Sequence, residues 1–378
     1  MKKQPHIIYI ITKLELGGAQ KICLALFNNA DPSCTSLISG TKGPLTELVK
    51  DKQNVYLLPQ LTREISFFGV FNELSALWAI TQKLRQLKRM HGNVIVHTHS
   101  TKAGLLGRWA AFFAGIQTRI HTVHGYYAFH ENQNIIIWTI TYLCELITSF
   151  VTTHYVCTTS HDVEEGIRLL PHFSSRHSII RPAVSVEQFI PAHQAASFPQ
   201  EKELFVFGCV ACFKPQKNIF DLLQAFRLVH IHNPKTRLEL IGDGALRPAI
   251  EDWIQAHQLT EVITLHGWQD NVAAIMSSWH AFVLSSLWEG ICMAIVEARL
   301  LKLPILSYNT GGIKDVVIHG KNGFLYPQKQ WQQLSHGMLA LSTNALLHTK
   351  LQSHADNLNE FYIEDMIDRH RKLYQLIK

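Results

Sequence analysis

The sequence is poor in the features that mark secreted or nucleic-acid-binding chains. Its seven cysteines are dispersed and odd in number, which argues against a disulfide framework. Lysine and arginine never form a run longer than two residues, and the diffuse net charge of +6 favours phosphate groups or an anionic membrane surface over nucleic acid. Behind Met1-Lys2-Lys3, the apolar run Ile7–Ile11 is too short for a signal-peptide core, so we expect a cytoplasmic protein.

Ligand sets for a metal ion are also missing from the sequence. No Asp-x-Asp occurs anywhere, and carboxylates are the usual ligands of a divalent cation. Cys209 and Cys212 form a lone Cys-x-x-Cys, which cannot complete a four-ligand zinc site. Their odd spacing in a strand-like run places them on opposite faces, and we interpret both as core thiols. We therefore expect no metal and no cofactor.

One long apolar segment, Asn134–Thr153, contains Glu145 as its only charge. A membrane span needs about 18–20 apolar residues. Threonines and Ser149 recur here together with the acid, so we expect a helix packed into the core. Contact between one face of this helix and a lipid-linked acceptor is the alternative interpretation.

Apolar runs alternate with helical patterns through the amino-terminal half. The expected helices are Gln20–Asn29, Phe71–Arg89 and Thr101–Ala114. The expected strands between them are His6–Thr12, Ser33–Ser39, Val55–Leu58, Asn93–His97 and Arg119–Val123. This rhythm predicts an α/β fold in which helices cover both faces of a parallel sheet. Ligands of such a sheet bind beyond the carboxyl ends of its strands, where His97, His99 and His124 lie.

The carboxy-terminal half repeats this pattern. Between the halves, Ser185–Glu203 mixes proline, alanine and glutamine without periodicity, which indicates a linker. A second sheet begins at Leu204–Val210, and the last helix, Ile363–Ile377, is a candidate to cross back onto the first domain. A chain of 378 residues is long enough for two cores. The expected domains are residues 1–190 and 200–360, followed by the helix within 361–378.

The segment Ser285–Ala298 carries the most informative pattern. The apolar run His280–Leu284 predicts a buried strand, Gly290 breaks the chain, and a helical pattern follows. Such a turn leaves backbone N–H groups free to bind an anion. Glu289 precedes the helix and Glu297 lies about 12 Å along it. Two carboxylates around an anion site suit a nucleotide sugar, although a pair like this on an amphipathic helix is more often a solvated face.

Ser286-Leu287-Trp288-Glu289-Gly290, with Glu297-Ala298 eight residues after the first glutamate, resembles the donor-site signature of the family 4 retaining glycosyltransferases. The resemblance extends from Gly17 to Gly323. It implies two Rossmann-like domains facing across a cleft, the GT-B fold, with the acceptor held by the first domain and the nucleotide sugar by the second. It also implies that Glu289 approaches the transferred sugar and that Glu297 holds the ribose.

Lys217 matches the lysine of the family motif Gly-Arg-Leu-x-x-x-Lys-Gly. It opens a helix after a strand, where an ammonium group can meet a phosphate, although a lysine at a helix start is usually exposed to solvent. Cys212 stands where the family commonly has arginine, and Lys214 is the candidate to replace that charge. The family's Asn-Gly is also absent from Ile179–Val184, so the resemblance assigns no role to that turn.

The resemblance assigns further residues to the site. A Gly-Gly loop lies under the diphosphate, a His-Gly at a strand end meets the transferred sugar, a Gly-Asp-Gly lines the donor cleft, and a residue after a strand contacts the base. The expected catalytic residues are Glu289 and His124, acting in transition-state positioning and not as nucleophiles. The expected donor-binding residues are Gly17, Gly18, Lys217, Gly244, Trp268, Gly290, Ile291 and Glu297.

These inferences together predict a retaining glycosyltransferase. It would move a sugar from a nucleotide diphosphate sugar to a glycan or lipid-linked acceptor, in cell-surface polysaccharide or lipopolysaccharide synthesis. We expect it in the cytoplasm, in peripheral contact with the inner face of the membrane. The alternative is a nucleotide-sugar epimerase or a non-catalytic nucleotide-sugar binder of the same fold. An epimerase would convert its nucleotide sugar with no acceptor present, whereas a binder would convert nothing.

Overall fold

The computed structural model describes residues 4–15, 17–41, 43–62, 70–125, 134–184, 186–187, 189 and 204–377. The chain divides into two compact units, Met1–Ala183 with Ile363–Lys378 and Val184–Tyr362. The division falls at Ala183, a few residues before the linker expected from composition, and most of that linker lies outside the described residues. The final helix, α13 (Ile363–Leu376), belongs to the first unit.

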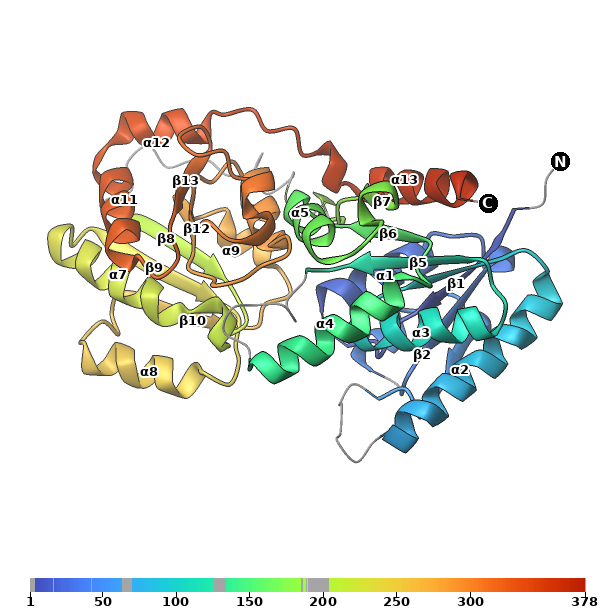
Figure 1. Cartoon of the computed structure of the whole chain (residues 1–378). Helices are drawn as coiled ribbons and strands as arrows, with labels where there is room; N and C mark the ends of the chain where they lie inside the picture. The colour runs from blue at the N-terminus through green and yellow to red at the C-terminus, as the bar shows by residue number, and fades with distance from the viewer. Residues whose placement is uncertain are drawn as a thin grey trace. The chain divides into compact units, whose positions relative to one another are not determined.

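The first unit is built on a seven-stranded parallel sheet with the order β3-β2-β1-β4-β5-β6-β7 (Figure 1). Its strands are β1 (His6–Ile10), β2 (Thr35–Ser39), β3 (Val55–Leu57), β4 (Val94–Thr98), β5 (Thr118–Val123), β6 (His154–Cys157) and β7 (His177–Ile179). Its connecting helices are α1 (Gly18–Asn28), α2 (Val70–His91), α3 (Thr101–Phe113), α4 (Ile135–Ser149) and α5 (Ser160–Leu169). The expected strands are found within two residues, and β6 and β7 were not foreseen.

The run Ile7–Ile10 is apolar throughout because β1 is buried on both faces. Ile7 and Tyr9 pack in one core with side chains of α1 and α13. Ile8 and Ile10 point to the opposite face and pack with side chains of α2 and α3. Successive residues of a strand alternate between faces, so a parallel strand covered on both sides needs an unbroken apolar run.

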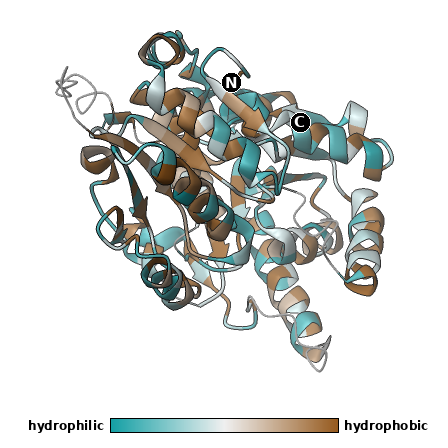
Figure 2. Ribbon diagram, turned by 90° about the vertical axis from the view of Figure 1, so that its left-hand side faces the viewer, coloured by the Kyte–Doolittle hydropathy of each residue, from teal (hydrophilic) through white to brown (hydrophobic). Residues whose placement is uncertain are grey.

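The second unit holds a six-stranded parallel sheet with the order β10-β9-β8-β11-β12-β13. Its strands are β8 (Phe205–Val210), β9 (Thr236–Ile241), β10 (Ile263–Gly267), β11 (Ala281–Leu284), β12 (Ile305–Tyr308) and β13 (Gly323–Tyr326). Its helices are α7 (Ile219–His232), α8 (Arg247–Ala256), α9 (Val272–Met276), α10 (Met293–Leu300), α11 (Trp331–Thr343) and α12 (Ala345–Gln352). Figure 2 shows mostly hydrophobic strands, and helices in which hydrophilic and hydrophobic residues alternate. The predicted α/β fold is confirmed.

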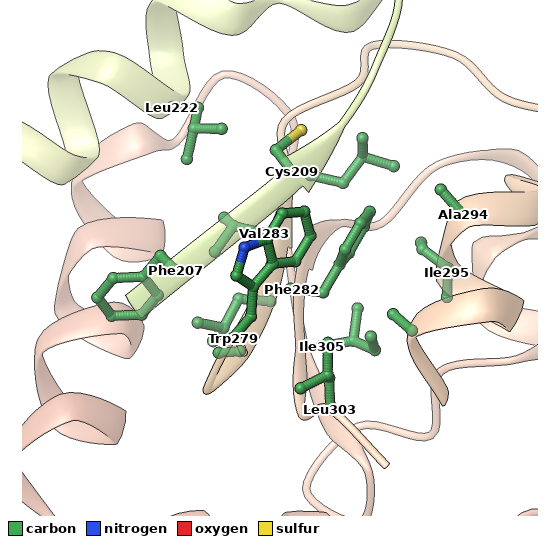
Figure 3. Close-up of a cluster of buried hydrophobic side chains, with 14 of the residues drawn as sticks. Phe207, Cys209, Leu222, Trp279, Phe282, Val283, Ala294, Ile295, Leu303 and Ile305 are labelled. Atoms are coloured by element: carbon green, nitrogen blue, oxygen red, sulfur yellow. The ribbon is translucent and has the colours of Figure 1, made fainter. Parts of the chain in front are cut away.

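Trp279 fills the centre of the second core. Figure 3 shows its ring among Phe207, Phe282 and Val283, and its indole nitrogen donates to Glu239 at 2.8 Å. Gly208 on β8 leaves the space for this ring, because a Cβ at that position would collide with the indole. A glycine in a central strand is therefore explained here by close packing.

Two sequence expectations need correction. Cys209 is buried as expected of a core thiol, but Cys212 is only half-buried. The predicted helix Asn134–Thr153 is seen as α4, yet it does not pack its isoleucines into the core: Ile136 and Ile140 are 65% and 54% exposed. Within the described part of the chain, no helix is long and apolar enough to cross a membrane.

Candidate functional site

The order of the second sheet brings two of its loops to one point. β8 is central, with β9 on one side and β11 on the other, so the connections after β8 and β11 lead away in opposite directions. Parallel sheets bind ligands at such a switch point, beyond the carboxyl ends of the strands. Lys217 lies in the loop after β8, and Glu289 lies in the loop after β11.

These two side chains form a buried ion pair. The Nζ atom of Lys217 lies 2.5 Å from Oε1 of Glu289, and the side chains are 13% and 6% exposed. Burial lowers the pKa of Lys217, but Cys292, the Glu289 carboxylate and Cys209 together outweigh it and hold that pKa above its ordinary value. Lys217 therefore carries its positive charge at neutral pH, as an interaction with phosphate requires.

Hydrogen bonds fasten the two loops to each other. The Ser285 hydroxyl, at the end of β11, donates to the carbonyls of Lys217 and Asn218 at 3.1 and 2.9 Å. The amide of Gln216 donates to the carbonyl of Trp288 at 2.7 Å. These contacts hold the backbone on both sides of the ion pair, so the positions of its two charges are set by the fold. Sequence analysis missed Gln216, since nothing in its local pattern links it to Trp288.

A third loop closes on Glu289 from the end of β12. The Thr310 hydroxyl donates to the carbonyl of Leu287 at 3.0 Å, and the Gly312 N–H donates to the carbonyl of Gly290 at 2.8 Å. Gly311 has a φ of +52°, and a Cβ there would collide with the Glu289 carbonyl. This position thus needs glycine for both its conformation and its close approach.

Helix α10 begins later than expected. Its first residue is Met293 and its N-cap is Cys292, so Gly290 and Ile291 belong to the loop between Glu289 and the helix. The first turn still presents backbone N–H groups that have no partner within the helix. Glu297 lies in the middle of α10, eight residues after Glu289 in the sequence, and its side chain is half-buried. Ser286, just before this loop, has a buried hydroxyl with no hydrogen-bond partner among the described residues.

The Gly242–Gly244 loop after β9 packs against the loop after β8. The Phe213 N–H donates to the Asp243 carbonyl at 2.9 Å, and a Cβ on Gly242 would collide with the Ala211 carbonyl. A Cβ on Gly244 would lie 2.5 Å from the Phe213 carbonyl oxygen. Both glycines are therefore required by contact between the two loops, whether or not a ligand binds there.

Trp268 follows β10 at the same edge of the sheet, and 67% of it is exposed. An exposed indole at a strand end offers a flat face on which an aromatic base can stack. Lys214 is exposed at the start of the short helical turn that ends at Lys217, while Cys212 carries no charge. The loop after β8 thus holds Lys214 as a second lysine, two residues after Cys212, the position at which the family commonly has arginine.

In the first unit, Gly17 and Gly18 lie where β1 leads into α1. Gly18 is already the first residue of α1, and Gly17 is its N-cap with an extended φ of −150°. A Cβ on Gly18 would meet no atom within 4 Å, and one on Gly17 would meet only the flexible Gln20 side chain. Neither the backbone nor the packing of the described residues requires glycine at Gly18. Leu16, in the same expected loop, lies outside the described residues.

His124 stands at the carboxyl end of β5, next to the end of β4, and β1 is one strand further on. Its Nε2 atom lies 3.1 Å from Nδ1 of His99, and Ser100, which follows His99, is bonded through its hydroxyl to that of Thr12 at 2.6 Å. Burial, with a smaller contribution from His370, lowers the pKa of His124 to about 4. The imidazole is therefore neutral at pH 7 and acts as a hydrogen-bonding group, not as a cation.

The histidines around His124 are largely structural. His97 is fully buried and bonded to Tyr374 of α13 and to Thr122, both at 2.7 Å. Nε2 of His99 is buried without a partner in the part of the chain that the structure describes. No group of three or more histidine, cysteine, aspartate or glutamate side chains suited to a metal ion occurs among the described residues. Independence from metal stays a prediction.

Comparisons with known proteins match the second unit to a family model and nearly the whole chain to curated relatives. The family model described as "Glycosyl transferases group 1" matches residues 192–358. A UDP-Gal:α-D-GlcNAc-diphosphoundecaprenol α-1,3-galactosyltransferase of Escherichia coli is 28% identical over 95% of this chain and 94% of its own. The capsular polysaccharide biosynthesis glycosyltransferase CapM of Staphylococcus aureus is 24% identical, over 75% of this chain and 74% of its own.

Solved structures show the same fold along nearly the whole chain. HepE of Anabaena, solved with UDP and glucose, aligns with a TM-score of 0.78 and 15% identity, covering 98% of this chain and all of its own. The lipopolysaccharide outer core galactosyltransferase WaaB aligns with a TM-score of 0.72 and 16% identity, over 98% of this chain and 99% of its own. The family match lies in the second unit and the Escherichia coli relative aligns along nearly the full length, so these findings support a group 1 glycosyltransferase of the GT-B fold.

Proposed function

We propose that this glycosyltransferase moves a sugar, with retention of the anomeric configuration, from a UDP-sugar to a lipid-linked diphosphate acceptor in cell-surface polysaccharide synthesis. The observation that carries the proposal is the Lys217–Glu289 pair at the switch point of the second sheet. It supplies one cation for a diphosphate and one carboxylate for the sugar beside it. The acceptor class rests on similarity to the Escherichia coli enzyme, whose acceptor is a diphosphoundecaprenol-linked GlcNAc.

The pair also suggests how a donor would be received. A diphosphate that reaches Lys217 competes with Glu289 for the ammonium group, and the incoming phosphate charge compensates Lys217 in its place. Glu289 is then released from the cation and faces the sugar. As the bond to the sugar lengthens, negative charge grows on the leaving phosphate, where Lys217 and the N–H groups at the start of α10 stabilise it.

Other predicted residues take supporting roles in this proposal. Trp268 would stack on the base and Glu297 would hold the ribose. His124, neutral at pH 7, would exchange hydrogen bonds with a sugar hydroxyl without adding charge. An acceptor carried on a lipid lies at a membrane, so the enzyme would work in peripheral contact with that surface.

The test is a transfer assay with the full chain, UDP-galactose and a GlcNAc-diphosphate joined to an alkyl chain, followed by mass spectrometry and by NMR of the new linkage. UDP-glucose and UDP-GlcNAc serve as competing donors. We expect a product only when donor and acceptor are both present, with the anomeric configuration of the donor. Conversion of the nucleotide sugar to an isomer without acceptor would identify an epimerase. Donor binding with no product from any pair would leave a non-catalytic binder.

A further inference from the structure

Helix α4 turns a continuous apolar stripe toward solvent. Ile135 and Ile137 in its first turn are exposed, and five further large exposed residues are spaced three and four positions apart on one helical face: Ile136, Ile140, Leu143, Ile147 and, at the C-cap, Phe150. Each of these five is between 47% and 65% exposed. A helix on the surface of a globular unit ordinarily has the opposite arrangement, with the apolar face inward.

The buried residues of α4 are polar (Glu145, Thr148 and Ser149), and Tyr142 packs beside them against the core. Arg108 of α3 donates two hydrogen bonds of 2.7 Å to the carboxylate of Glu145, which makes a buried bidentate ion pair. The indole nitrogen of Trp109 donates to the Thr148 hydroxyl at 3.0 Å. Since rotating the helix would break this ion pair in the interior, the apolar stripe is held outward by the fold.

The apolar surface continues onto the end of α3. The Trp109 ring lies 5.8 Å from the rings of Phe112 and Phe113, which are 46% and 49% exposed. In Figure 1, α2, α3 and α4 lie in a row, and contacts join α2 to α3 and α3 to α4. Contiguous exposed apolar surface of this kind marks an interaction site.

Basic side chains border this surface. The Arg119 guanidinium lies over the Phe112 ring at 5.7 Å, and Arg85 of α2 donates to the Phe113 carbonyl at 3.1 Å. Lys88, one turn further on, donates to the Gly115 carbonyl at 2.7 Å. The two acids of the described parts of α2, α3 and α4 are already paired, since Glu73 binds Lys102 and Glu145 binds Arg108. The border is therefore positively charged.

Helix α2 repeats the combination of apolar and basic residues. Leu74 and Trp78 are exposed by 56% and 66%, and Arg85 and Arg89 follow on the same helical face. A helix face with an aromatic side chain, aliphatic side chains and arginines is typical of segments that lie in the interface of an anionic bilayer. A second copy of the chain would bring like charges together there, whereas anionic lipid head groups complement them.

We propose that the outer face of α4, the ring cluster of α3 and the basic face of α2 form a surface that docks on a membrane containing anionic lipid. The apolar stripe would enter the head-group region, and Arg85, Lys88 and Arg89 would meet lipid phosphates. The docking surface would hold the enzyme where a lipid-linked acceptor lies. In this purpose the inference rests on the proposed function.

The test measures binding of the full chain to vesicles, without donor or acceptor. Vesicles of phosphatidylcholine with phosphatidylglycerol should sediment the wild-type chain, and vesicles of phosphatidylcholine alone should sediment much less of it. Ile140→Ser with Ile147→Ser should lower the affinity for the anionic vesicles roughly tenfold, which equals about 1.4 kcal/mol. The matched control is Ile231→Ser with Leu346→Ser, two exposed apolar positions of the second unit, which should bind as the wild type does.

A second pair of variants tests the charges. Arg85→Gln with Arg89→Gln should weaken binding to anionic vesicles and flatten its salt dependence, while Arg371→Gln should change neither. Equal binding by wild type and both double variants, or no binding of wild type to anionic vesicles, overturns the proposal. A dimer that Ile140→Ser with Ile147→Ser dissociates, seen by light scattering, would instead assign the surface to a second copy.

The docking surface and the proposed function can fail separately. All variants should transfer sugar to a short-chain acceptor in solution at the wild-type rate. Vesicle binding as expected, with no transfer by any variant, contradicts the proposed function alone. Transfer in solution, with no binding to anionic vesicles, contradicts the docking surface alone.

Discussion

The Nζ atom of Lys217 lies 2.5 Å from Oε1 of Glu289, although the two residues are 72 positions apart in the sequence. The two charges neutralise each other, and both side chains are largely buried. They lie at the switch point of the second sheet, where the connections after β8 and β11 lead in opposite directions. A donor therefore meets an ammonium group that is already positioned and charged. The same arrangement means that removing either residue leaves the other as an uncompensated buried charge.

The first prediction concerns Lys217. Lys217→Ala should weaken binding of the nucleotide diphosphate sugar by about 1.5–3 kcal/mol, the range for hydrogen bonds to charged groups. It should also lower the free energy of unfolding by about 3–5 kcal/mol, because Glu289 loses its partner in the interior. Isothermal titration calorimetry measures the first effect and thermal or urea unfolding measures the second.

Two controls separate these effects. Lys214→Ala, on the same loop but exposed, should leave stability unchanged and lose less donor affinity. Lys217→Met combined with Glu289→Gln removes both charges and should recover most of the lost stability, but not the donor affinity. If Lys217→Ala binds the donor as tightly as wild type, Lys217 is a structural residue only.

The sequence predicted the two residues of this site but not their contact. It predicted the α/β fold and placed Lys217 and Glu289 after strands, because apolar runs and glycine turns are local patterns. It did not predict that they pair, since their distance follows from sheet order. The order β9-β8-β11 brings the two loops together, and periodicity carries no information about strand order. The sequence favoured a core-packed α4 and kept an outward face only as the alternative, because the orientation of the helix depends on the bond between Arg108 and Glu145.

The second prediction divides the two glutamates by role. Glu297→Gln should mainly raise the donor KM, because contacts to the ribose are nearly equal in the ground and transition states. Glu289→Gln should mainly lower kcat, because charge develops beside it as the bond to phosphate lengthens. Steady-state kinetics of both variants decides the matter. In the reverse pattern, Glu297→Gln would lower kcat and Glu289→Gln would raise only KM. That result would place the transferred sugar at Glu297 and the ribose at Glu289.

The third prediction is that turnover needs no divalent ion. The sequence has no Asp-x-Asp, and Lys217 with the start of α10 supplies positive potential for the diphosphate. Dialysis against EDTA should leave kcat and KM unchanged, and added magnesium or manganese should not raise them. Activity that disappears with chelator and returns with either metal would show the prediction to be wrong.

The fourth prediction contrasts two glycines. Gly18→Ala adds a methyl group that meets nothing in the first turn of α1, so stability should be unchanged or rise by about 0.4–1 kcal/mol. If the glycine is kept to admit a ligand, affinity for donor or acceptor should fall. Gly244→Ala pushes a methyl group against the Phe213 carbonyl and should destabilise by about 1–3 kcal/mol. Melting temperatures and calorimetric affinities of both variants check this, and unchanged affinities for Gly18→Ala would remove Gly18 from the site.

The last prediction concerns acid stability of the first unit. Burial lowers the pKa of a group of its histidines below 6.5, and His6, His124, His154 and His370 reach about 4. Three others are shifted in the same direction: His97, His99 and His121. Above about pH 6.5 these side chains are neutral in both the folded and the unfolded chain, and they add no pH dependence. As the pH falls toward 4, the unfolded chain takes up protons that the folded chain refuses.

Stability of the first unit should therefore fall steeply between about pH 6.5 and pH 4, at a cost of about 1.4 kcal/mol for each unit by which a pKa is lowered. Asp162 opposes this, because burial raises its pKa to about 6, but it is one group against seven. Calorimetric scans at about pH 7 and about pH 5 measure the effect. His370→Gln should flatten the dependence and the exposed His336→Gln should not. Equal slopes for the wild type and His370→Gln would show that these buried imidazoles do not set the acid limit.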